Sequence, residues 1–493
     1  MERTDNGAWT QVPLRFFCAE EGDYTMEDRM ERKALDWGLH EECGVFGICD
    51  PAGSCAQTTY YGLYALQHRG QEACGIATIN DREQSFYKDV GLVSEVFDKQ
   101  TLARLNGTMA VGHVRYATTG AGERENAQPL TLKYVKGTLA VAHNGNLVNT
   151  PELRTSFEYR GAIFQTTTDS ELIAYAIAQE RLRCGSAEEA VCQAVKGLRG
   201  AFSLIVMSAR KLIAARDPWG FRPLCMGRRG QAVVFASESC ALDAVGAAFE
   251  REIDPGEIVV VEDGQVRSIR ENCAGATSHM CIFEYIYFAR PDSVICGQSV
   301  HEARLEAGRI LAREHPVDAD VVIGVLDSGL DAAMGYAEES GIPYGQGFVK
   351  NRYIGRTFIT PDQQSREQAV RIKLGALRST VEGRRVVMID DSIVRGATSR
   401  QIISLLREAG AKEVHFRVSA PPFIAPCYFG TDIPDKKDLI ACHHTVEEIR
   451  RLVGADTLGF LSVDALERIA PSAACGFCKG CFTEEYPVAT AGM

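Results

Sequence analysis

The segment that most restricts the fold of this chain is a strand–loop–helix sequence near residue 390. The apolar residues 386–389 lead into two adjacent carboxylates, Asp390 and Asp391. A loop with Gly396, Thr398 and Ser399 then opens a helix. Similar apolar strands and helices alternate throughout the second half, which predicts a parallel sheet built from β-α-β units. Ligands of such sheets bind at the carboxyl ends of the strands.

The loop after this strand has the chemistry of a phosphate site. A helix start offers free backbone N–H groups and the positive end of the helix dipole. Asp390 and Asp391 would repel a phosphate, so we expect them to face ribose hydroxyls or a bound Mg²⁺. The segment lacks the G-x-x-x-x-G-K-[S/T] pattern, which favours a sugar phosphate over the γ-phosphate of ATP. The alternative is a strand that ends in two solvated aspartates before a capped helix.

The first half has a different pattern. From Cys43 to about residue 270, short apolar strands with glycine turns surround one helical stretch, which fits antiparallel strands in two sheets enclosed by helices. The polar, turn-rich residues 270–280 suggest a boundary, and 493 residues is a natural length for two domains. The predicted divisions are a leader at 1–42, domains at 43–275 and 276–470, and a tail at 471–493.

Charge and hydropathy exclude several classes of protein. A net charge of −12 without a basic face argues against nucleic-acid binding. No apolar stretch reaches the roughly 18 residues of a membrane span. The acidic leader lacks the apolar core of a secretory signal, so we expect a cytoplasmic protein.

Cys43 opens the run C-G-V-F-G-I after this leader. If the chain is cut before it, one residue supplies a thiol nucleophile and an α-amine base, whose ordinary pKa is about 7.7–8.0. Downstream, Arg115 could grip an α-carboxylate and Asp169 an α-ammonium. Asn144 and Gly145, expected at a turn, could donate to an oxyanion. Each of these residues alone more often has a structural role. The N-G pair, for example, is also a common hairpin signal that needs no chemistry.

The 17 cysteines are odd in number and scattered, which argues against a disulfide framework. Cys475, Cys478 and Cys481 form a C-x-x-C-x-x-C run, with Cys281 and Cys427 as distant candidates. This spacing suits an iron–sulfur or zinc site. Four ligands are needed, and the sequence alone leaves open whether Cys475 or Cys478 is one of them.

The 384–399 segment resembles the phosphoribosyl pyrophosphate (PRPP) signature of type I phosphoribosyltransferases. Asp327 and Ser328, in V-L-D-S-G, and the basic run K-N-R-Y-I-G-R resemble further parts of that site. The resemblance implies a Mg²⁺ site at Ser328, Asp390 and Asp391. It implies PRPP contacts by Asp390, Asp391, Ser392, Arg395, Gly396, Thr398, Ser399, Lys350, Arg352 and Arg356.

Cys43 and its partners, with Y-Y-G-L-Y-A-L-Q-H-R-G-Q-E and D-P-W-G-F-R-P, resemble the N-terminal-nucleophile (Ntn) glutamine amidotransferases. Over nearly all of 43–490, both halves together resemble the iron–sulfur members of the glutamine PRPP amidotransferase family. That implies an αββα glutaminase sandwich joined to a type I phosphoribosyltransferase domain. It also implies glutamine and PRPP as substrates, Mg²⁺, a homotetramer and inhibition by purine nucleotides. By the same resemblance, Cys281, Cys427, Cys478 and Cys481 hold one [4Fe–4S] cluster and Cys475 is a free thiol.

Two features depart from that family. Leu326 stands where proline is common, and the leader is long enough that Met26 or Met30 could be the true start. Three rival hypotheses remain. One is a sugar-phosphate aminotransferase, which the 390–399 segment disfavours. The others are a PRPP-binding regulator without catalysis, and an enzyme with an inactive glutaminase.

Overall fold

Antiparallel strands of the first half pair into two sheets. The computed structural model describes residues 43–116, 124–351, 374–433 and 435–489, with the backbone of β1 (Glu2–Arg3) and β2 (Trp9–Thr10). One sheet has seven strands in the order β13-β11-β12-β3-β6-β4-β5, and the other has six in the order β15-β14-β10-β9-β8-β7. The predicted leader, β1 and β2 apart, lies outside the described residues.

The strands of the seven-stranded sheet are β3 (Gly44–Cys49), β4 (Ala73–Asn80), β5 (Glu83–Val90), β6 (Met109–Arg115), β11 (Cys225–Arg229), β12 (Ala232–Ala236) and β13 (Ala248–Glu252). Those of the six-stranded sheet are β7 (Leu130–Tyr134), β8 (Gly137–Leu147), β9 (Gly200–Ser208), β10 (Lys211–Arg216), β14 (Ile258–Glu262) and β15 (Gln265–Ile269).

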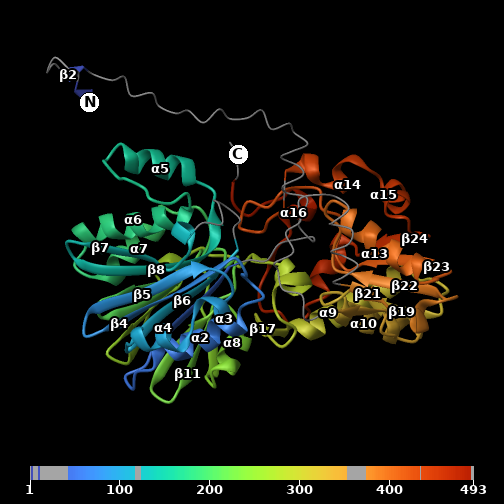
Figure 1. The fold of residues 1–493 in the computed structure, drawn as a ribbon, viewed down its shortest axis with the longest axis horizontal. Coiled ribbons are helices and arrows are strands. Elements are labelled where there is room, and N and C mark those ends of the chain that lie inside the picture. Colours follow the sequence, from blue (N-terminus) through green and yellow to red (C-terminus); the bar gives the residue numbers. More distant parts are fainter. Residues whose placement is uncertain are drawn as a thin grey trace.

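The two sheets stack face to face around a common core that includes Val45, Ile205 and Phe235. Helices α2 (Cys55–Ala65) and α8 (Ser239–Ala244) cover the outer face of the larger sheet. Helices α6 (Asp169–Arg183) and α7 (Ala187–Val195) cover the smaller one. These four layers, visible in Figure 1, confirm the predicted αββα sandwich. Smaller helices on this half are α3 (Val93–Val96), α4 (Lys99–Arg104) and α5 (Thr150–Glu158).

A parallel sheet forms the centre of the second half, as predicted. Its four strands are β19 (Val321–Gly324), β22 (Arg385–Asp390), β23 (Glu413–Val418) and β24 (Thr457–Phe460). Along β22, Val387 and Ile389 pack toward α9 (Val300–Glu314) and α10 (Leu330–Ser340). Val386 and Met388 pack on the opposite face, toward α13 (Ala397–Glu408) and α15 (Val446–Val453). Burial on both faces explains why the strand is continuously apolar.

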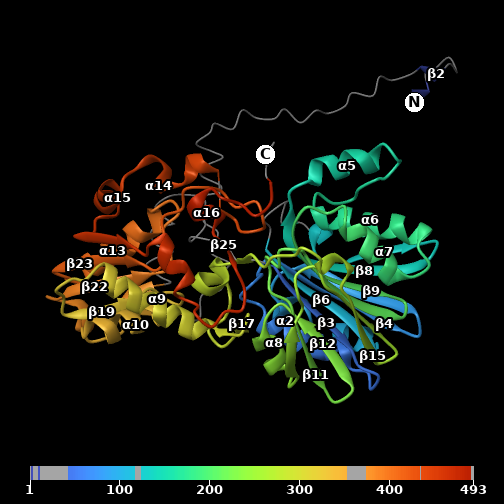
Figure 2. The ribbon, with the colours of Figure 1, turned by 180° about the vertical axis from the view of Figure 1, so that it is seen from behind.

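The halves lie side by side, as the view from behind in Figure 2 also shows. The predicted boundary at residues 275–276 falls between β15 and β16 (Met280–Cys281). Other short elements are β17 (Val294–Ile295), β18 (Gln298–Ser299), β20 (Phe348–Lys350), β21 (Leu374–Ala376), β25 (Phe477–Cys478), α12 (Arg378–Val381), α14 (Ile440–His443), α16 (Gly480–Thr483) and a π-helical turn, Glu284–Phe288. Among the helices of the described ranges, none is long and apolar enough to cross a membrane.

Candidate functional site

Cys43 lies immediately before β3, beside the end of β6. The register pairs Gly44 with Val114, which places Cys43 next to Arg115. The Cys43 Sγ donates to the Tyr116 carbonyl at 3.4 Å. Its own carbonyl accepts a hydrogen bond from Arg69 Nε at 3.1 Å. The structure therefore brings these two predicted residues together, with Arg115 2% exposed and Cys43 partly buried.

Asn144 and Gly145 lie inside β8, so the prediction of a turn is wrong. They pair with Ser203 and Phe202 of β9. Gly145 has φ of +141°, and a Cβ there would lie 2.2 Å from the Ala201 carbonyl oxygen. Close approach of two strands, rather than a hairpin, therefore requires this glycine. The Asn144 Nδ2 is buried and has no hydrogen-bond partner among the described residues, so a strong donor is left free.

Asp169 begins α6 and is held beside the same strand. One carboxylate oxygen accepts from the Leu147 N–H at 2.9 Å, and the other lies 3.6 Å from His143 Nδ1. Burial acts to raise the pKa of Asp169, but His143 and these hydrogen bonds outweigh it and hold the pKa below its usual value. The carboxylate is therefore kept ionised.

A contact between two histidines joins β6, which ends beside Cys43, to β8, which carries Asn144. His113 of β6 places its Nε2 3.0 Å from the His143 carbonyl oxygen of β8. Burial lowers the pKa of His113 to about 3, so this ring is neutral. The contact holds the end of β6, next to Cys43, against the part of β8 that carries Asn144.

Arg69 connects the candidate nucleophile to the second half, and no role was predicted for it. Besides the Cys43 carbonyl, it contacts Glu238 at 2.6 Å and Glu284 at 2.7 Å, and all three side chains are fully buried. Arg69 stands in the quoted Q-H-R-G-Q-E run, but its partner Glu284 is 215 residues away in the sequence. Nothing local in the sequence signals such a pairing.

A second contact joins the halves beside Gly145. The Asn146 Nδ2 donates to the Tyr428 carbonyl at 2.9 Å, and Arg222 Nη2 donates to the Phe429 carbonyl at 2.7 Å. The rings of Phe221 and Phe429 stack at 4.3 Å between centroids. Residues 428–430 of the second half therefore touch the strand that carries Asn144 and Gly145.

The carboxylate pair lies at the carboxyl end of β22. Asp390 and Asp391 are 8% and 7% exposed. The hydroxyls of Ser328 and Ser392 each donate to Asp391 at 2.5 Å. Burial, followed by the charge of Asp391, raises the pKa of Asp390 well above its usual value. Two adjacent carboxylates that burial and their mutual repulsion make costly to ionise together are suited to a cation.

The loop after the pair opens α13 as predicted. Gly396 precedes the helix with φ of +79°, and a Cβ there would lie 2.9 Å from Ile440 Cδ1. Thr398 and Ser399 follow in the first turn, and Arg395 is exposed. The first N–H groups of α13 are therefore available to a phosphate.

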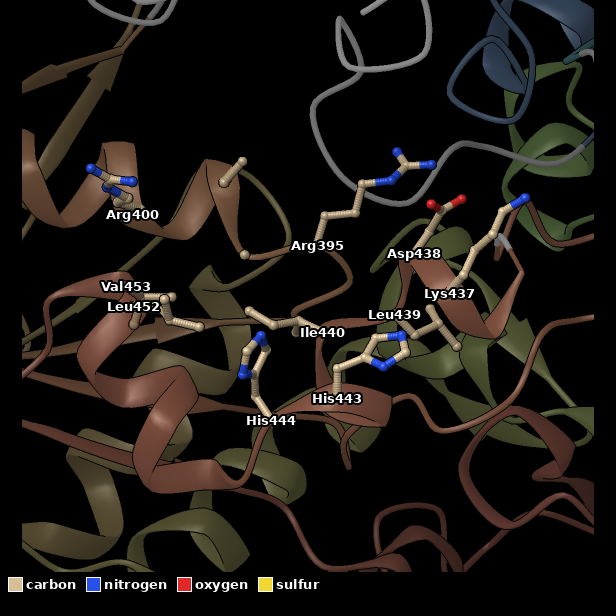
Figure 3. Close-up of a pocket in the computed structure, with 12 residues that line it drawn as sticks. Arg395, Arg400, Lys437, Asp438, Leu439, Ile440, His443, His444, Leu452 and Val453 are labelled. Carbon is tan, nitrogen blue, oxygen red and sulfur yellow. The ribbon is translucent and has the colours of Figure 1, made fainter. Parts of the chain in front are cut away.

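A cavity of about 370 Å³ borders this helix start. Of its basic lining residues, Arg395 was predicted. Arg400 on the same helix was not predicted, nor were Lys437, His443 and His444, which come from a segment distant in the sequence. Figure 3 shows the cavity beside the start of α13. On its other side lie the turn with Lys437 and the helix with His443, and Ile440 and Leu452 are apolar residues of its lining.

Lys350 ends β20 and forms an ion pair with Asp327 at 2.8 Å. This brings one predicted cation to the loop that carries Ser328. Arg352 and Arg356 lie outside the described residues.

Four of the five candidate cysteines gather at one place. β16 and β25 pair in parallel, with Cys281 opposite Cys478. Burial raises the pKa of the Cys481 thiol well above its usual value, and the adjacent Cys427, Cys281 and Cys478 raise it further. Cys475 instead lies near Cys296 and raises the pKa of that thiol. Within the described ranges, no group of three or more His, Cys, Asp or Glu side chains is already arranged as a metal site.

The donor set nevertheless fits an iron–sulfur cluster. Four thiols from three separate segments match the all-thiolate ligation such clusters take. The Cys281 N–H also bonds the Phe221 carbonyl at 3.0 Å, so this site adjoins the junction between the halves.

The fold and these sites define the class: an Ntn glutamine amidotransferase joined to a type I phosphoribosyltransferase. A family model described as a glutamine amidotransferase domain matches residues 113–244, and one described as a phosphoribosyl transferase domain matches 301–423. The chain belongs to the amidophosphoribosyltransferase family, whose members are pentosyltransferases.

Relatives of that name are similar over most of the chain. The protein from Methanocaldococcus jannaschii is 48% identical, covering 90% of this chain and 97% of its own. That from Bacillus subtilis is 50% identical, covering 91% and 95%. A chloroplastic protein of Arabidopsis thaliana is 49% identical, covering 91% and 79%.

Two solved structures share the whole architecture. One, described as the allosteric regulatory enzyme of purine biosynthesis, has a TM-score of 0.86 at 48% identity and covers 91% of this chain and 97% of that one. The other is glutamine PRPP amidotransferase from B. subtilis complexed with ADP and GMP, with a TM-score of 0.84 at 48% identity, covering 91% and 98%.

Proposed function

We propose that this protein converts PRPP, glutamine and water into 5-phosphoribosylamine, pyrophosphate and glutamate, the first committed step of purine synthesis. One observation carries the proposal: Arg69 bonds both the Cys43 carbonyl and Glu284 of the second half. The candidate glutaminase nucleophile is thus tied by a buried ion pair to the half that carries the candidate phosphoribosyl site.

In the glutaminase step, removal of residues 1–42 frees the α-amine of Cys43, which takes the thiol proton as the sulfur attacks the glutamine amide. The Asn144 Nδ2 and the Gly145 N–H donate to the resulting oxyanion. The free, buried Nδ2 supports this role, because a donor that is already desolvated needs no reorganisation when the charge develops. The protonated amine then gives its proton to the departing ammonia, and water hydrolyses the thioester.

Arg115 and Asp169 bind the two ends of the glutamine backbone in this proposal. The fork of Arg115 takes the α-carboxylate, and Asp169 takes the α-ammonium. The lowered pKa of Asp169 supports its role, since an ionised carboxylate is the form that pairs with an ammonium.

At the second site, the start of α13 holds the 5-phosphate of PRPP through the N–H groups at Ala397, Thr398 and Ser399. Asp390, Asp391 and Ser392 face the ribose, and Lys350, Arg352 and Arg356 bind pyrophosphate. Ser328, Asp390 and Asp391 would hold Mg²⁺, which supplies neutralisation of the pyrophosphate charge. The raised pKa of Asp390 supports a cation there, because the pair is costly to ionise alone.

Ammonia passes internally between the sites, since free ammonia would be protonated and diffuse away. The contact of residues 428–430 with Gly145 and Asn146 supports this, because it brings the second half directly against the oxyanion strand.

Cys281, Cys427, Cys478 and Cys481 would hold one [4Fe–4S] cluster, which supplies a structural crosslink between the tail and the junction of the halves. We further propose a cytoplasmic homotetramer that purine nucleotides inhibit. The B. subtilis structure with ADP and GMP supports the last point.

The deciding experiment measures pyrophosphate release and phosphoribosylamine formation with glutamine or with ammonium as nitrogen donor. We expect both donors to work. Binding of PRPP without pyrophosphate release would indicate a regulator, and activity with ammonium alone would indicate an inactive glutaminase. The intact mass and first residue of the mature protein test whether Cys43 carries a free amine.

A further inference from the structure

Two cysteines outside every site described above lie against each other where the tail meets the second half. Cys475 raises the pKa of the Cys296 thiol, so the two thiols lie close together although they are far apart in the sequence. The backbone holds the two segments together as well. The Ala474 N–H donates to the Cys296 carbonyl at 2.9 Å, and the Ser472 N–H donates to the Gln298 side chain at 3.0 Å.

The backbone at Cys296 is unusual for its residue type. Cys296 and Gly297 are the two central residues of the β17–β18 hairpin, with φ of +49° and +78°. A two-residue hairpin with both φ values positive favours Asn-Gly or Asp-Gly, and cysteine is not among the residues that adopt it readily. The turn therefore places a thiol, at some conformational cost, in contact with the tail.

A proton acceptor lies beside Cys296. Cys296 Sγ lies 3.7 Å from the Glu252 carboxylate and 3.8 Å from the Met280 sulfur. Cys475, together with burial and Glu252, raises the pKa of Cys296, so this thiol keeps its proton. Both cysteines are only partly buried, so a small oxidant can reach them.

We propose that Cys296 and Cys475 form a reversible disulfide when the protein meets a peroxide. The Cys475 sulfur attacks the peroxide, becomes a sulfenic acid and releases water. The Cys296 sulfur then attacks that sulfur, its proton passes through Glu252 to the departing hydroxyl, and a second water leaves. In sum, two thiols lose two electrons and two protons, and hydrogen peroxide is reduced to two waters.

The proposed disulfide attaches the tail to the second half at a point three residues before Cys478. It links Cys475 to the β17–β18 turn, so residues 472–476 can no longer separate from the second half even if Cys478 and Cys481 lose their ligands. The pair is distinct from the four cysteines proposed for the cluster, and the inference does not depend on the proposed reaction.

The test uses the full-length protein purified without oxygen and treated with graded hydrogen peroxide. Free thiols are alkylated, and the protein is digested with trypsin and chymotrypsin. Cleavage after Phe288 separates Cys281 from Cys296, and cleavage after Phe477 separates Cys475 from Cys478. We expect one peptide pair joined through Cys296 and Cys475, two hydrogens lighter than the separate peptides and split by dithiothreitol.

Three variants make the result specific. Cys442→Ser, a partly buried cysteine elsewhere in this half, should form the link as the wild type does. Cys296→Ser and Cys475→Ser should not form it, and both should retain the iron content of the wild type. A link between Cys475 and Cys478, over-oxidation of wild-type Cys475 without any link, or loss of iron from Cys475→Ser would each overturn the proposal.

Discussion

The buried guanidinium of Arg69 donates to both carboxylate oxygens of Glu284, at 2.7 and 2.9 Å, across the junction of the two halves. The same guanidinium contacts Glu238 and the Cys43 carbonyl. Because both carboxylates are fully buried, neither can exchange this partner for water without a large desolvation cost. The backbone of Cys43 is therefore positioned by an ion pair that only the joined halves complete.

Replacement of Glu238 by glutamine should destabilise the protein in a pH-dependent way. Burial acts to raise the pKa of Glu238, but His68 and Arg69 outweigh it and hold the pKa below its ordinary value of 4.5. The ionised group therefore stabilises the fold above about pH 4.5, and this contribution is lost as the pH falls below that value toward the folded-state pKa.

We expect Glu238→Gln to lose about 3–5 kcal/mol at pH 7, and the gap from the wild type to narrow below pH 4.5. Urea midpoints between pH 3.5 and 7 measure this. Glu250→Gln is the control, because Glu250 and Arg228 are both 41% exposed, and it should cost at most about 1 kcal/mol. An equal loss at every pH would contradict the assigned ion pair.

Cys43→Ala should lower glutamine-dependent synthesis by about 10³-fold or more and leave ammonium-dependent synthesis near the wild-type rate. The thiol serves only the amide cleavage, whereas ammonium enters at the second site. Cys49→Ala, at the other end of β3, should keep both activities. If a folded Cys43→Ala protein loses both, the two sites are not separate.

Asn144→Ala should lower kcat for glutamine hydrolysis by about 10²–10³-fold with little change in KM, since the lost hydrogen bond forms only with the oxyanion. Steady-state glutaminase assays separate the two constants. Asn146→Ala serves as a comparison, because the Asn146 Nδ2 already bonds Tyr428 and is not a free donor. A rise in KM alone would instead place Asn144 in ground-state binding.

Asp391→Asn should abolish pyrophosphate release with either nitrogen donor while basal glutamine hydrolysis continues. The carboxylate accepts both serine hydroxyls and is proposed to hold Mg²⁺, so its loss affects only the second site. Magnesium titrations followed by PRPP binding check the cause. Retained synthesis at ordinary magnesium concentrations would remove Asp391 from the metal site.

Cys481→Ser should lose the iron and sulfide of the anaerobically purified protein, because one of four proposed thiolates is missing. Cys442→Ser should retain both. Elemental and sulfide analysis provides the measurement, and stoichiometric zinc in the wild type would show that the cofactor is a different one.

Features written in local sequence were predictable. The apolar run that ends at Asp390 and the glycine before α13 gave the parallel sheet and its loop, since both depend on neighbours within a few residues. The αββα arrangement was predicted from the short apolar strands and from the resemblance of the Cys43 motifs to the Ntn glutamine amidotransferases.

Features that depend on distant pairing were not predictable. Asn144 and Gly145 look like a hairpin turn, yet β9 pairs with them and keeps them extended. Cys475 and Cys478 differ in their surroundings because Cys475 lies near Cys296, whereas Cys478 pairs with Cys281. Both partners lie far earlier in the chain. The roles of Arg352, Arg356 and the leader remain predictions, because these residues lie outside the described ranges.

The stacked rings of Phe221 and Phe429 bear on how such a chain can be engineered. Both are almost completely buried, Phe221 at 0% and Phe429 at 2% exposure, and each belongs to a different half. A glutaminase half excised at the boundary would present Phe221 and Arg222 to solvent and lose the support behind Gly145. A chimera with a foreign acceptor half must therefore recreate the 428–431 segment, so the two halves are not interchangeable parts.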